Sequence, residues 1–315
     1  MKKRLLLIRI VGTLFLVTGL FSLFAFPAEF TSFYAFSNGG AFTYEGFGFG
    51  SILFAEILTS ALIYAALALI CIPVGIENTK STYLGYKLSC ILFITMIAIG
   101  ISSVICIGLS FRLLDLFSVS QYIIIISVLT LTLVILPYLL LRFYQNQKTK
   151  QIFGPSQNTY LENQSEQKLV VVVMNLVWVM AFAVMIFLKG AFPFMGRFIF
   201  KTQGTYLLSA VIFTFIVLNY LFYKNIRLIK YAMLVFYTFL ALSVVMTFSI
   251  IPVRDFIGML ELPAYEMREM ASLLNIVSEI HIWLFFGVML VIQTILLLTD
   301  KKPMHDRLVY LEKNH

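Results

Sequence analysis

Charged residues are scarce in this sequence. Only 12% of its 315 residues are Asp, Glu, Lys or Arg, whereas 61% are hydrophobic. A soluble globular chain has about a quarter of its residues charged and about half apolar. The shortage of charge therefore argues against a soluble domain. Apolar stretches of about 20 residues, long enough to cross a bilayer as a helix, recur along the whole chain instead.

Motifs for catalysis, metal binding and nucleic-acid binding are also missing. No H-E-x-x-H or G-x-S-x-G motif occurs, and the three cysteines (Cys71, Cys90 and Cys106) form no C-x-x-C pair. The sequence therefore predicts no catalytic residue, no metal site and no cofactor, and an enzyme is poorly supported. The net charge of +8 does not indicate a nucleic-acid partner, because Lys and Arg at the cytoplasmic ends of membrane spans give the same balance.

The apolar stretches predict an all-α fold, a polytopic integral membrane protein with a bundle of eight transmembrane helices. Helices are expected because lipid offers the backbone no hydrogen-bond partner. The first stretch resembles the apolar region of a signal peptide but is long for one, so we interpret it as a retained span. The predicted spans are residues 5–26, 50–75, 87–109, 121–143, 169–189, 206–223, 231–252 and 279–299.

The distribution of basic residues predicts the orientation of the bundle. If the N-terminus lies inside, the inner segments contain 17 of the 23 Lys and Arg residues and the outer segments contain the other six. Because cytoplasmic loops are enriched in Lys and Arg, we expect both termini to be cytoplasmic. The expected location is the plasma (inner) membrane, so the first partner of the chain is the lipid bilayer.

A polar segment divides the chain into two similar parts. Residues 144–168 carry a Gly-Pro pair, many amides and no apolar periodicity, which predicts a cytoplasmic linker loop. It separates an N-terminal four-helix half (1–143) from a C-terminal four-helix half (169–299), which a cytoplasmic tail (300–315) follows. The tripeptide Ala-Phe-Pro ends the first span and recurs at the end of the fifth. Two parallel four-helix repeats would explain the recurrence, and so would chance.

The second span contains a polar stripe. Glu56 lies six residues after Gly50, and Ser60 and Tyr64 follow at i+4 and i+8 on the same helix face. An ionisable residue within a span is a functional hypothesis, because a free carboxylate is costly in hydrocarbon. We expect the stripe to face the bundle interior or water. The alternative is that Glu56 reaches the interface, or bonds a neighbouring Ser or Thr to hold helices together.

The outer end of the eighth span has a second polar group. Glu279 and His281 lie there, and a histidine beside carboxylates can exchange protons near neutral pH. Arg254, at the outer end of the seventh span, is a candidate cationic partner for Glu56 or Glu279. Ordinary headgroup-level residues are the alternative interpretation. The predicted ligand-binding residues are Glu56, Ser60, Tyr64, Arg254, Glu279 and His281.

Other features point to helix packing and to the outer surface. Asn175, Asn219 and Gln293 are explained by hydrogen bonds between helices. The loop between the first two spans is rich in Phe and Tyr, and residues 110–117 show helical spacing. Residues 263–280 predict either an amphipathic helix on the outer interface or an early start of the eighth span that projects outward.

Two hypotheses for function follow. The first is a transporter-like or channel-like protein for a small or lipophilic solute, with an outward-facing polar site around Glu56. The second is a non-catalytic membrane subunit or scaffold. It would bind a partner membrane protein, a second copy of the chain or a lipid through the aromatic outer loop and the interfacial helix.

Overall fold

Helices make up almost all of the described structure. The computed structural model describes residues 2–36, 51–108, 117–153, 166–224, 226, 228–262, 264, 266–267 and 279–299. In this part of the chain, eight helices are long and apolar enough to cross a membrane. Each overlaps one of the eight predicted spans. The prediction of an all-α fold is confirmed, with one short β-hairpin as an exception.

The N-terminal half is formed by four apolar helices, of which the fourth is divided into three segments. A short helix and a 3-10 turn follow it. The elements are α1 (Lys2–Phe36), α2 (Ile52–Thr79), α3 (Tyr83–Gly108), α4 (Val119–Thr130), the π-helical turn η2 (Leu131–Ile135), α5 (Leu136–Gln145), α6 (Gln147–Lys150) and the 3-10 turn η3 (Gln151–Phe153).

The C-terminal half is formed by four further apolar helices, a β-hairpin and a short helix. The elements are α7 (Glu166–Phe187), β1 (Phe192–Phe194), β2 (Arg197–Ile199), α8 (Lys201–Tyr223), α9 (Ile229–Ile250), α10 (Val253–Met259) and α12 (Glu279–Thr299).

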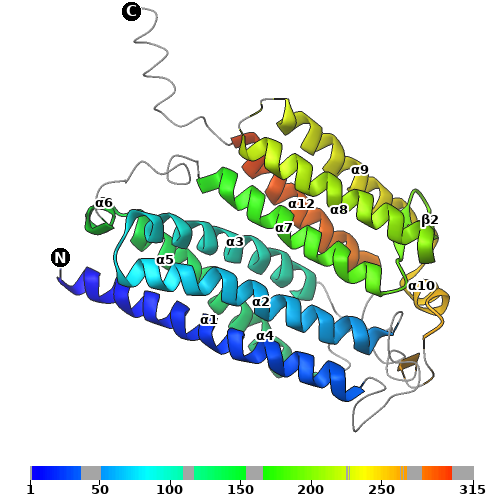
Figure 1. The fold of residues 1–315 in the computed structure, drawn as a ribbon, viewed down its shortest axis with the longest axis horizontal. Helices are drawn as coiled ribbons and strands as arrows, with labels where there is room; N and C mark the ends of the chain where they lie inside the picture. Colours follow the sequence, from blue (N-terminus) through cyan, green and yellow to red (C-terminus); the bar gives the residue numbers. More distant parts are fainter. Residues whose placement is uncertain are drawn as a thin grey trace, which may run out of the picture.

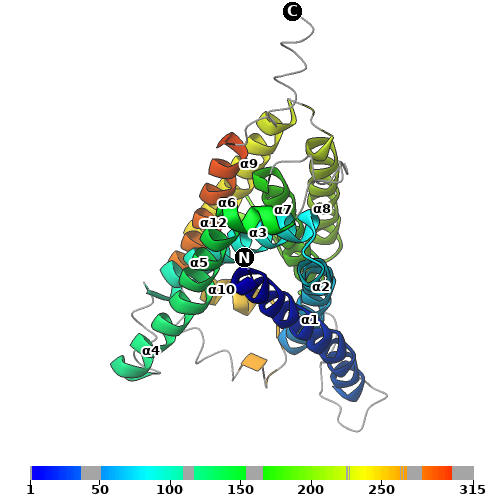
Figure 2. The ribbon, with the colours of Figure 1, turned by 90° about the vertical axis from the view of Figure 1, so that its left-hand side faces the viewer.

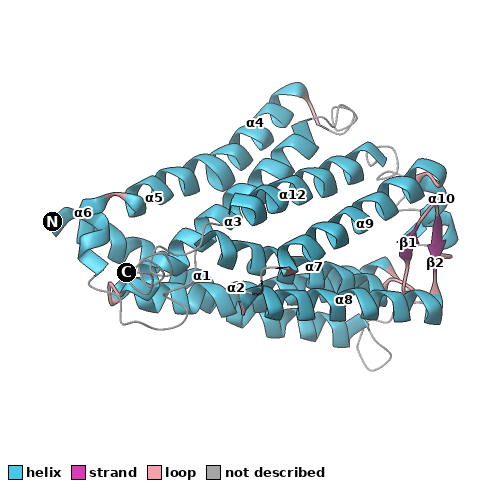
Figure 3. Cartoon of the chain, turned by 90° about the horizontal axis from the view of Figure 1, so that it is seen from above, coloured by secondary structure: helices cyan, strands magenta, loops and turns pink. Residues whose placement is uncertain are grey.

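The long helices lie side by side along one axis of the molecule (Figure 1). The N-terminus of α1 and the C-terminal end of α12 are at the same end, which we call the inner end after the predicted orientation. The β-hairpin and α10 lie at the opposite, outer end (Figures 1 and 3). The two halves meet at α3, which contacts α2, α4 and α5 of its own half and α7 and α12 of the other, and at α2, which contacts α7.

Glycines allow α1 and α2 to pack with their backbones close together. A Cβ atom added at Gly75 of α2 would lie 2.6 Å from the amide nitrogen of Leu16 and 2.8 Å from the carbonyl oxygen of Gly12 in α1. Small residues at such crossings are typical of helix pairs in membranes, where close van der Waals packing replaces the hydrophobic effect.

A buried hydrogen-bond network joins four helices of the C-terminal half. Asn175 of α7 donates to the Oδ1 atom of Asn219 in α8, at 2.7 Å, and accepts from the hydroxyl of Tyr237 in α9. The Oδ1 atom of Asn175 also accepts a hydrogen bond from the side-chain amide of Gln293 in α12. The amide oxygen of Gln293 in turn accepts a hydrogen bond from the indole of Trp178. The prediction that Asn175, Asn219 and Gln293 hold helices together is therefore confirmed.

The N-terminal half has a smaller network at its inner end. Asn78 of α2 donates to Ser89 of α3, and its Oδ1 atom accepts from the hydroxyl of Tyr144 in α5, at 3.0 Å. All three side chains are fully buried. Arg4 of α1 donates to Asn146 and Thr149 nearby, so the inner ends of α1, α2, α3 and α5 are tied together.

The outer hairpin was not predicted. Met195 and Gly196 connect its strands with positive φ angles of 44° and 94°, the geometry of tight hairpin turns. Their amides donate to Ser243 and Thr247 of α9, at 3.2 and 3.1 Å. The turn is therefore held by side chains of a helix 50 residues later in the sequence, a contact that no local pattern indicates.

The two Ala-Phe-Pro tripeptides have different structures. The helix α1 continues through Pro27 to Phe36, whereas Pro193 lies in the strand β1. A proline removes one backbone hydrogen bond, and in an apolar environment a continued helix leaves fewer backbone groups unpaired than a break would. The tripeptide therefore does not support the predicted repeat, and the relation between the halves stays a prediction.

The predicted linker begins with ordered structure. Residues 147–153 form α6 and η3, and Phe153 is buried against Tyr86 and Tyr144. This packing places the start of the 144–168 segment against the inner ends of α3 and α5, in contrast to the predicted loop. The aromatic outer loop beyond Phe36, residues 110–116, most of the predicted interfacial helix and the tail after Thr299 lie outside the described residues.

Candidate functional site

One face of α2 changes from exposed to buried along its length. Glu56 is exposed near the outer end, and Ile63 and Leu67 on the same face are 49% and 37% exposed. Val74 follows Glu56 by about five helical turns and so shares its face, yet it is 2% exposed, and Asn78 one turn later is fully buried. This face is therefore covered at the inner end and open at the outer end.

The residues that cover this face at the inner end identify the side to which it points. Asn78 bonds to Ser89 of α3 and Tyr144 of α5. Asn78 also lies against Gly12 of α1, so at the inner end this side of α2 is covered by α1, α3 and α5 together. At the outer end, Glu56 and Ile63 on the same side are exposed, and among the described residues the fourth span does not cover them.

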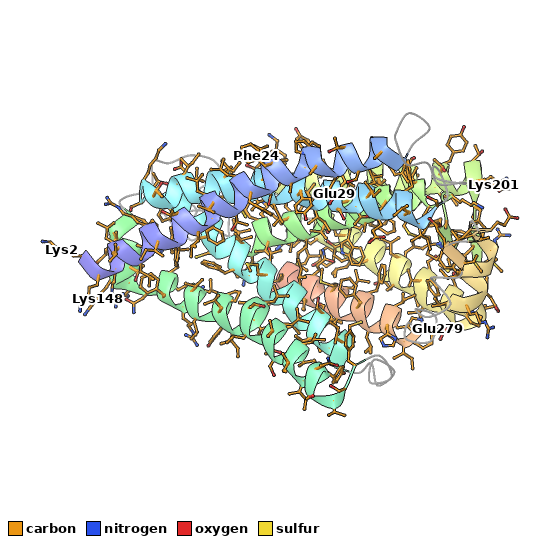
Figure 4. The ribbon with its side chains drawn as sticks, turned by 90° about the horizontal axis from the view of Figure 1, so that it is seen from below. Lys2, Phe24, Glu29, Lys148, Lys201 and Glu279 are labelled. Carbon is orange, nitrogen blue, oxygen red and sulfur yellow. The ribbon has the colours of Figure 1, made fainter. Side chains whose placement is uncertain are left out.

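The outer halves of α1 and α4 diverge. Lys2 at the start of α1 and Lys148 of α6, which follows the fourth span, lie at the same, inner end of the molecule (Figure 4). From there α1 and the fourth span separate toward the outer end (Figures 2 and 4). No residue of α4 is buried, and Ile123, Ile124 and Val128 are each more than half exposed. We call the region between the outer halves of α2 and α4 the outer opening.

The predicted polar stripe is only partly buried. Ser60 and Tyr64 are half-buried, whereas Glu56 is exposed, and the expectation that the stripe faces the bundle interior or water stays a prediction. The exposure of Glu56 agrees with the divergence of α4, which does not cover the outer end of this helix face in the part of the chain that the structure describes. Within the described residues, Glu56 makes no hydrogen bond or ion pair with Arg254, Glu279 or His281.

The other predicted residues gather at a separate outer corner. Glu279, at the first turn of α12, accepts a hydrogen bond of 2.8 Å from the amide of Val253 and so caps the N-terminus of α10. Arg254 is the next residue in α10 and is exposed. The backbone carbonyl of His281 lies 3.6 Å from the sulfur of Cys106 in α3. These contacts give Glu279 a capping role and connect α12 with α3.

A second carboxylate at the outer end was missed as a site residue. Glu266 is 3% exposed, and its two oxygens accept from the amides of Ile52 and Leu53, at 2.7 and 2.8 Å. Ser51 caps the same helix by accepting from Phe54. A carboxylate at a helix N-terminus is stabilised by the free amides and the helix dipole. The partners are more than 200 residues apart, so no signal in the sequence pairs them.

The charge around the outer opening has one sign along α1 and α2. No Lys, Arg or His occurs from residue 10 to residue 79, whereas the outer halves of α1 and α2 carry the described glutamates Glu29 and Glu56. Glu29 lies on the outer half of α1 (Figure 4) and is half-buried. Ile63 and Leu67 provide apolar surface on this face of α2, and the exposed carboxylate of Glu56 lies at its outer end. This arrangement can hold an apolar group beside a hydrogen-bond donor or a hydrated ion.

Metal-ligand geometry and similarity to known proteins provide no further assignment. Among the described residues, no group of three or more His, Cys, Asp or Glu side chains is placed to hold a metal ion. Comparisons with known proteins find no family model, no curated protein and no solved structure that matches the chain.

Proposed function

We propose that this chain is a multi-pass integral membrane protein that binds a small or lipophilic solute in the outer opening and takes part in its transport. In this proposal both termini lie in the cytoplasm and Glu56 is the polar group of the site. The observation that carries it is the change along one face of α2, from exposed Glu56 and Ile63 to buried Val74 and Asn78. A face that is open outside and closed inside is the shape of an outward-facing binding site.

The exposure of Glu56 supports a site that contains water or a polar ligand. A carboxylate in contact with acyl chains would be strongly destabilised, since lipid offers it neither a hydrogen-bond donor nor a counter-charge. Glu56 has no protein partner among the described residues. Its charge is therefore best accommodated if water or a solute occupies the outer opening.

A second candidate function rests on α4. This helix has no buried residue, and its large exposed hydrophobic side chains, Val119, Ile123, Ile124 and Val128, are all β-branched. A helix of this kind is also suited to a membrane subunit that binds another membrane protein along α4. In that case the outer opening would be filled by apolar side chains of the partner and would not admit water.

Cysteine accessibility distinguishes the two functions. Leu67 and Leu69 lie near the middle of α2, at almost the same depth, and Leu69 is 76% exposed. About 200° of helical rotation separates them, so only Leu67 is on the Glu56 face. After Cys71, Cys90 and Cys106 are replaced by Ala, each leucine is changed to Cys. A membrane-impermeant maleimide is then added from outside, because the thiolate that reacts forms only in water.

The proposed site predicts that Leu67→Cys is labelled at least tenfold faster than Leu69→Cys. A cysteine at Gly39 in the first outer loop serves as the positive control for outside access. If neither leucine variant is labelled while the Gly39 variant is, the opening contains no water and the solute site is wrong. Equal labelling of the two variants would also contradict it, because the Glu56 face would then have no special access.

A further inference from the structure

The fourth span changes its helical geometry near its middle. Between α4 and α5, residues Leu131–Ile135 form a π-helical turn, in which the amide of Leu136 donates to the carbonyl of Leu131. Pro137 follows and has no amide hydrogen to donate. In a regular α-helix the amide of residue 137 would donate to the carbonyl of Leu133, and proline cannot make this bond. The helical hydrogen-bond ladder is therefore weakened at this turn, and π-helical turns of this kind are frequent at functional sites.

The π-helical turn lies directly on the backbone of α3. A Cβ atom added at Gly100 would be 2.7 Å from the Cβ atom of Leu133 and 2.7 Å from its carbonyl oxygen. The two helices thus touch at a point where α3 has no side chain. This contact gives the π-helical turn a fixed point against α3.

The segments on the two sides of this contact are held very differently. On the inner side, Pro137 and Tyr144 of α5 are buried, and Tyr144 packs on Phe93 and Phe153 and bonds to Asn78. On the outer side, α4 has no buried residue. Among the described residues, the only hydrogen bond from α4 to another helix runs from the hydroxyl of Tyr122 to the carbonyl of Ile107 in α3.

From these contacts we infer that α4 is a gate over the outer opening, which pivots at Leu131–Ile135 against Gly100 and is held open by Tyr122. The gate's role in covering a solute rests on the proposed function, whereas its movement does not. The 12 residues of α4 form an arm about 18 Å long, so a swing of 20° would move its tip by ~6 Å. Toward α2, that movement covers the face that carries Glu56 and Ile63.

Distances between spin labels on the full-length protein in lipid nanodiscs test the gate. Native cysteines are replaced by Ala, and labels are attached at Ile124 of α4 and Ile63 of α2, which are exposed on the two sides of the outer opening. The matched control pair is Leu139 of α5 and Leu6 of α1, which are exposed on the inner side of the pivot. We expect two distances or one broad distribution for the outer pair, and one narrow distribution for the inner pair.

Two variants test the pivot at Leu131–Ile135 and the hydrogen bond of Tyr122 separately. Pro137→Ala restores an amide to the helix and is expected to narrow the outer distribution. Tyr122→Phe removes the bond to Ile107 and is expected to shift the outer distances to shorter values. The control Tyr138→Phe alters an exposed hydroxyl of α5 that bonds only to Arg142 among the described residues, and it should leave both distributions unchanged.

The gate is wrong if the outer pair gives the same single narrow distance in the wild type, Pro137→Ala and Tyr122→Phe. Should Pro137→Ala fail to fold, the wild-type distribution and Tyr122→Phe decide the question. These distances require no solute, so their outcome is independent of the labelling of Leu67→Cys. If the outer pair gives two distances and Leu67→Cys is not labelled, the gate is supported and the solute site is rejected. If the outer pair gives one narrow distance and Leu67→Cys is labelled, the solute site is supported and the gate is rejected.

Discussion

Asn175 illustrates how single polar residues are used in this protein. Its amide bonds to Asn219, and its oxygen accepts from Tyr237 and Gln293, so four helices share one buried group. In hydrocarbon an unpaired amide would cost several kcal/mol. The network therefore fixes the rotation of each helix about its axis, and its side chains are buried and bonded to one another.

Tyr237→Phe tests the contribution of this network to stability. The change removes one hydroxyl and leaves the ring, so it should lower the free energy of unfolding by about 0.5–1.5 kcal/mol. The measurement is unfolding by SDS titration of the purified protein. Tyr231→Phe is the matched control, because Tyr231 lies on the same helix and is 66% exposed. Equal loss of stability in both variants would contradict the role given to the Tyr237 hydroxyl.

At this scale the sequence predicted some roles and missed others. Asn175, Asn219 and Gln293 were predictable because an amide within an apolar span needs a partner on another helix. The two hydrogen bonds of Glu266 to α2 were not predictable, since they join residues more than 200 positions apart. For Glu56, helical spacing shows which residues share its face but not which neighbour covers that face, so its exposure is known only from the structure.

At the scale of elements, the pairing of α1 with α2 depends on glycine. Gly75→Ala places a Cβ atom 2.6 Å from the backbone of Leu16, so the two helices must separate. We expect a loss of about 1–3 kcal/mol in the free energy of unfolding. The same substitution at Gly287 of α12, where no atom lies within 4 Å of the added Cβ, should leave stability unchanged or slightly raised. SDS titration of both variants makes the comparison, and an unaffected Gly75→Ala would contradict the close packing.

Element positions were predictable to the extent that they depend on local composition. Long apolar runs gave all eight helices, because length and hydropathy are properties of each segment alone. The continuation of α1 through Pro27, the hairpin at Met195 and Gly196, and the π-helical turn before Pro137 depend on backbone pairing or on neighbours. Proline and glycine mark such places in the sequence, but the surrounding packing decides whether the chain breaks, bends or continues.

At the scale of the whole molecule, the predicted orientation places the inner end of the bundle in the cytoplasm and the outer end outside the membrane. A cysteine introduced at Gly39 should be labelled by an impermeant reagent from outside, and one at Gln157 should be labelled only after the membrane is permeabilised. The physical reason is the excess of Lys and Arg in the segments assigned to the cytoplasm. The opposite pattern would reverse the orientation and place the outer opening on the cytoplasmic side.

The relation between the two halves also belongs to this scale. Each half contains an Asn–Tyr hydrogen bond, but Asn78 and Tyr144 join the second and fourth spans, whereas Asn175 and Tyr237 join the fifth and seventh, so the two bonds do not correspond in a repeat. If the halves descend from a duplication, α2, α3 and the fourth span should superpose on α8, α9 and α12 in order and tilt. Different order or tilt throughout would leave the recurring Ala-Phe-Pro as a coincidence.

A density map of the full-length protein in a lipid nanodisc tests the central claim most directly. The claim is that the outer opening between α2 and α4 is a site and that Glu56 faces it. The account predicts non-protein density, from solute or ordered water, within hydrogen-bonding distance of the Glu56 carboxylate and on the α4 side of α2. A Glu56 side chain on the opposite side of α2, surrounded by acyl chains, would contradict it.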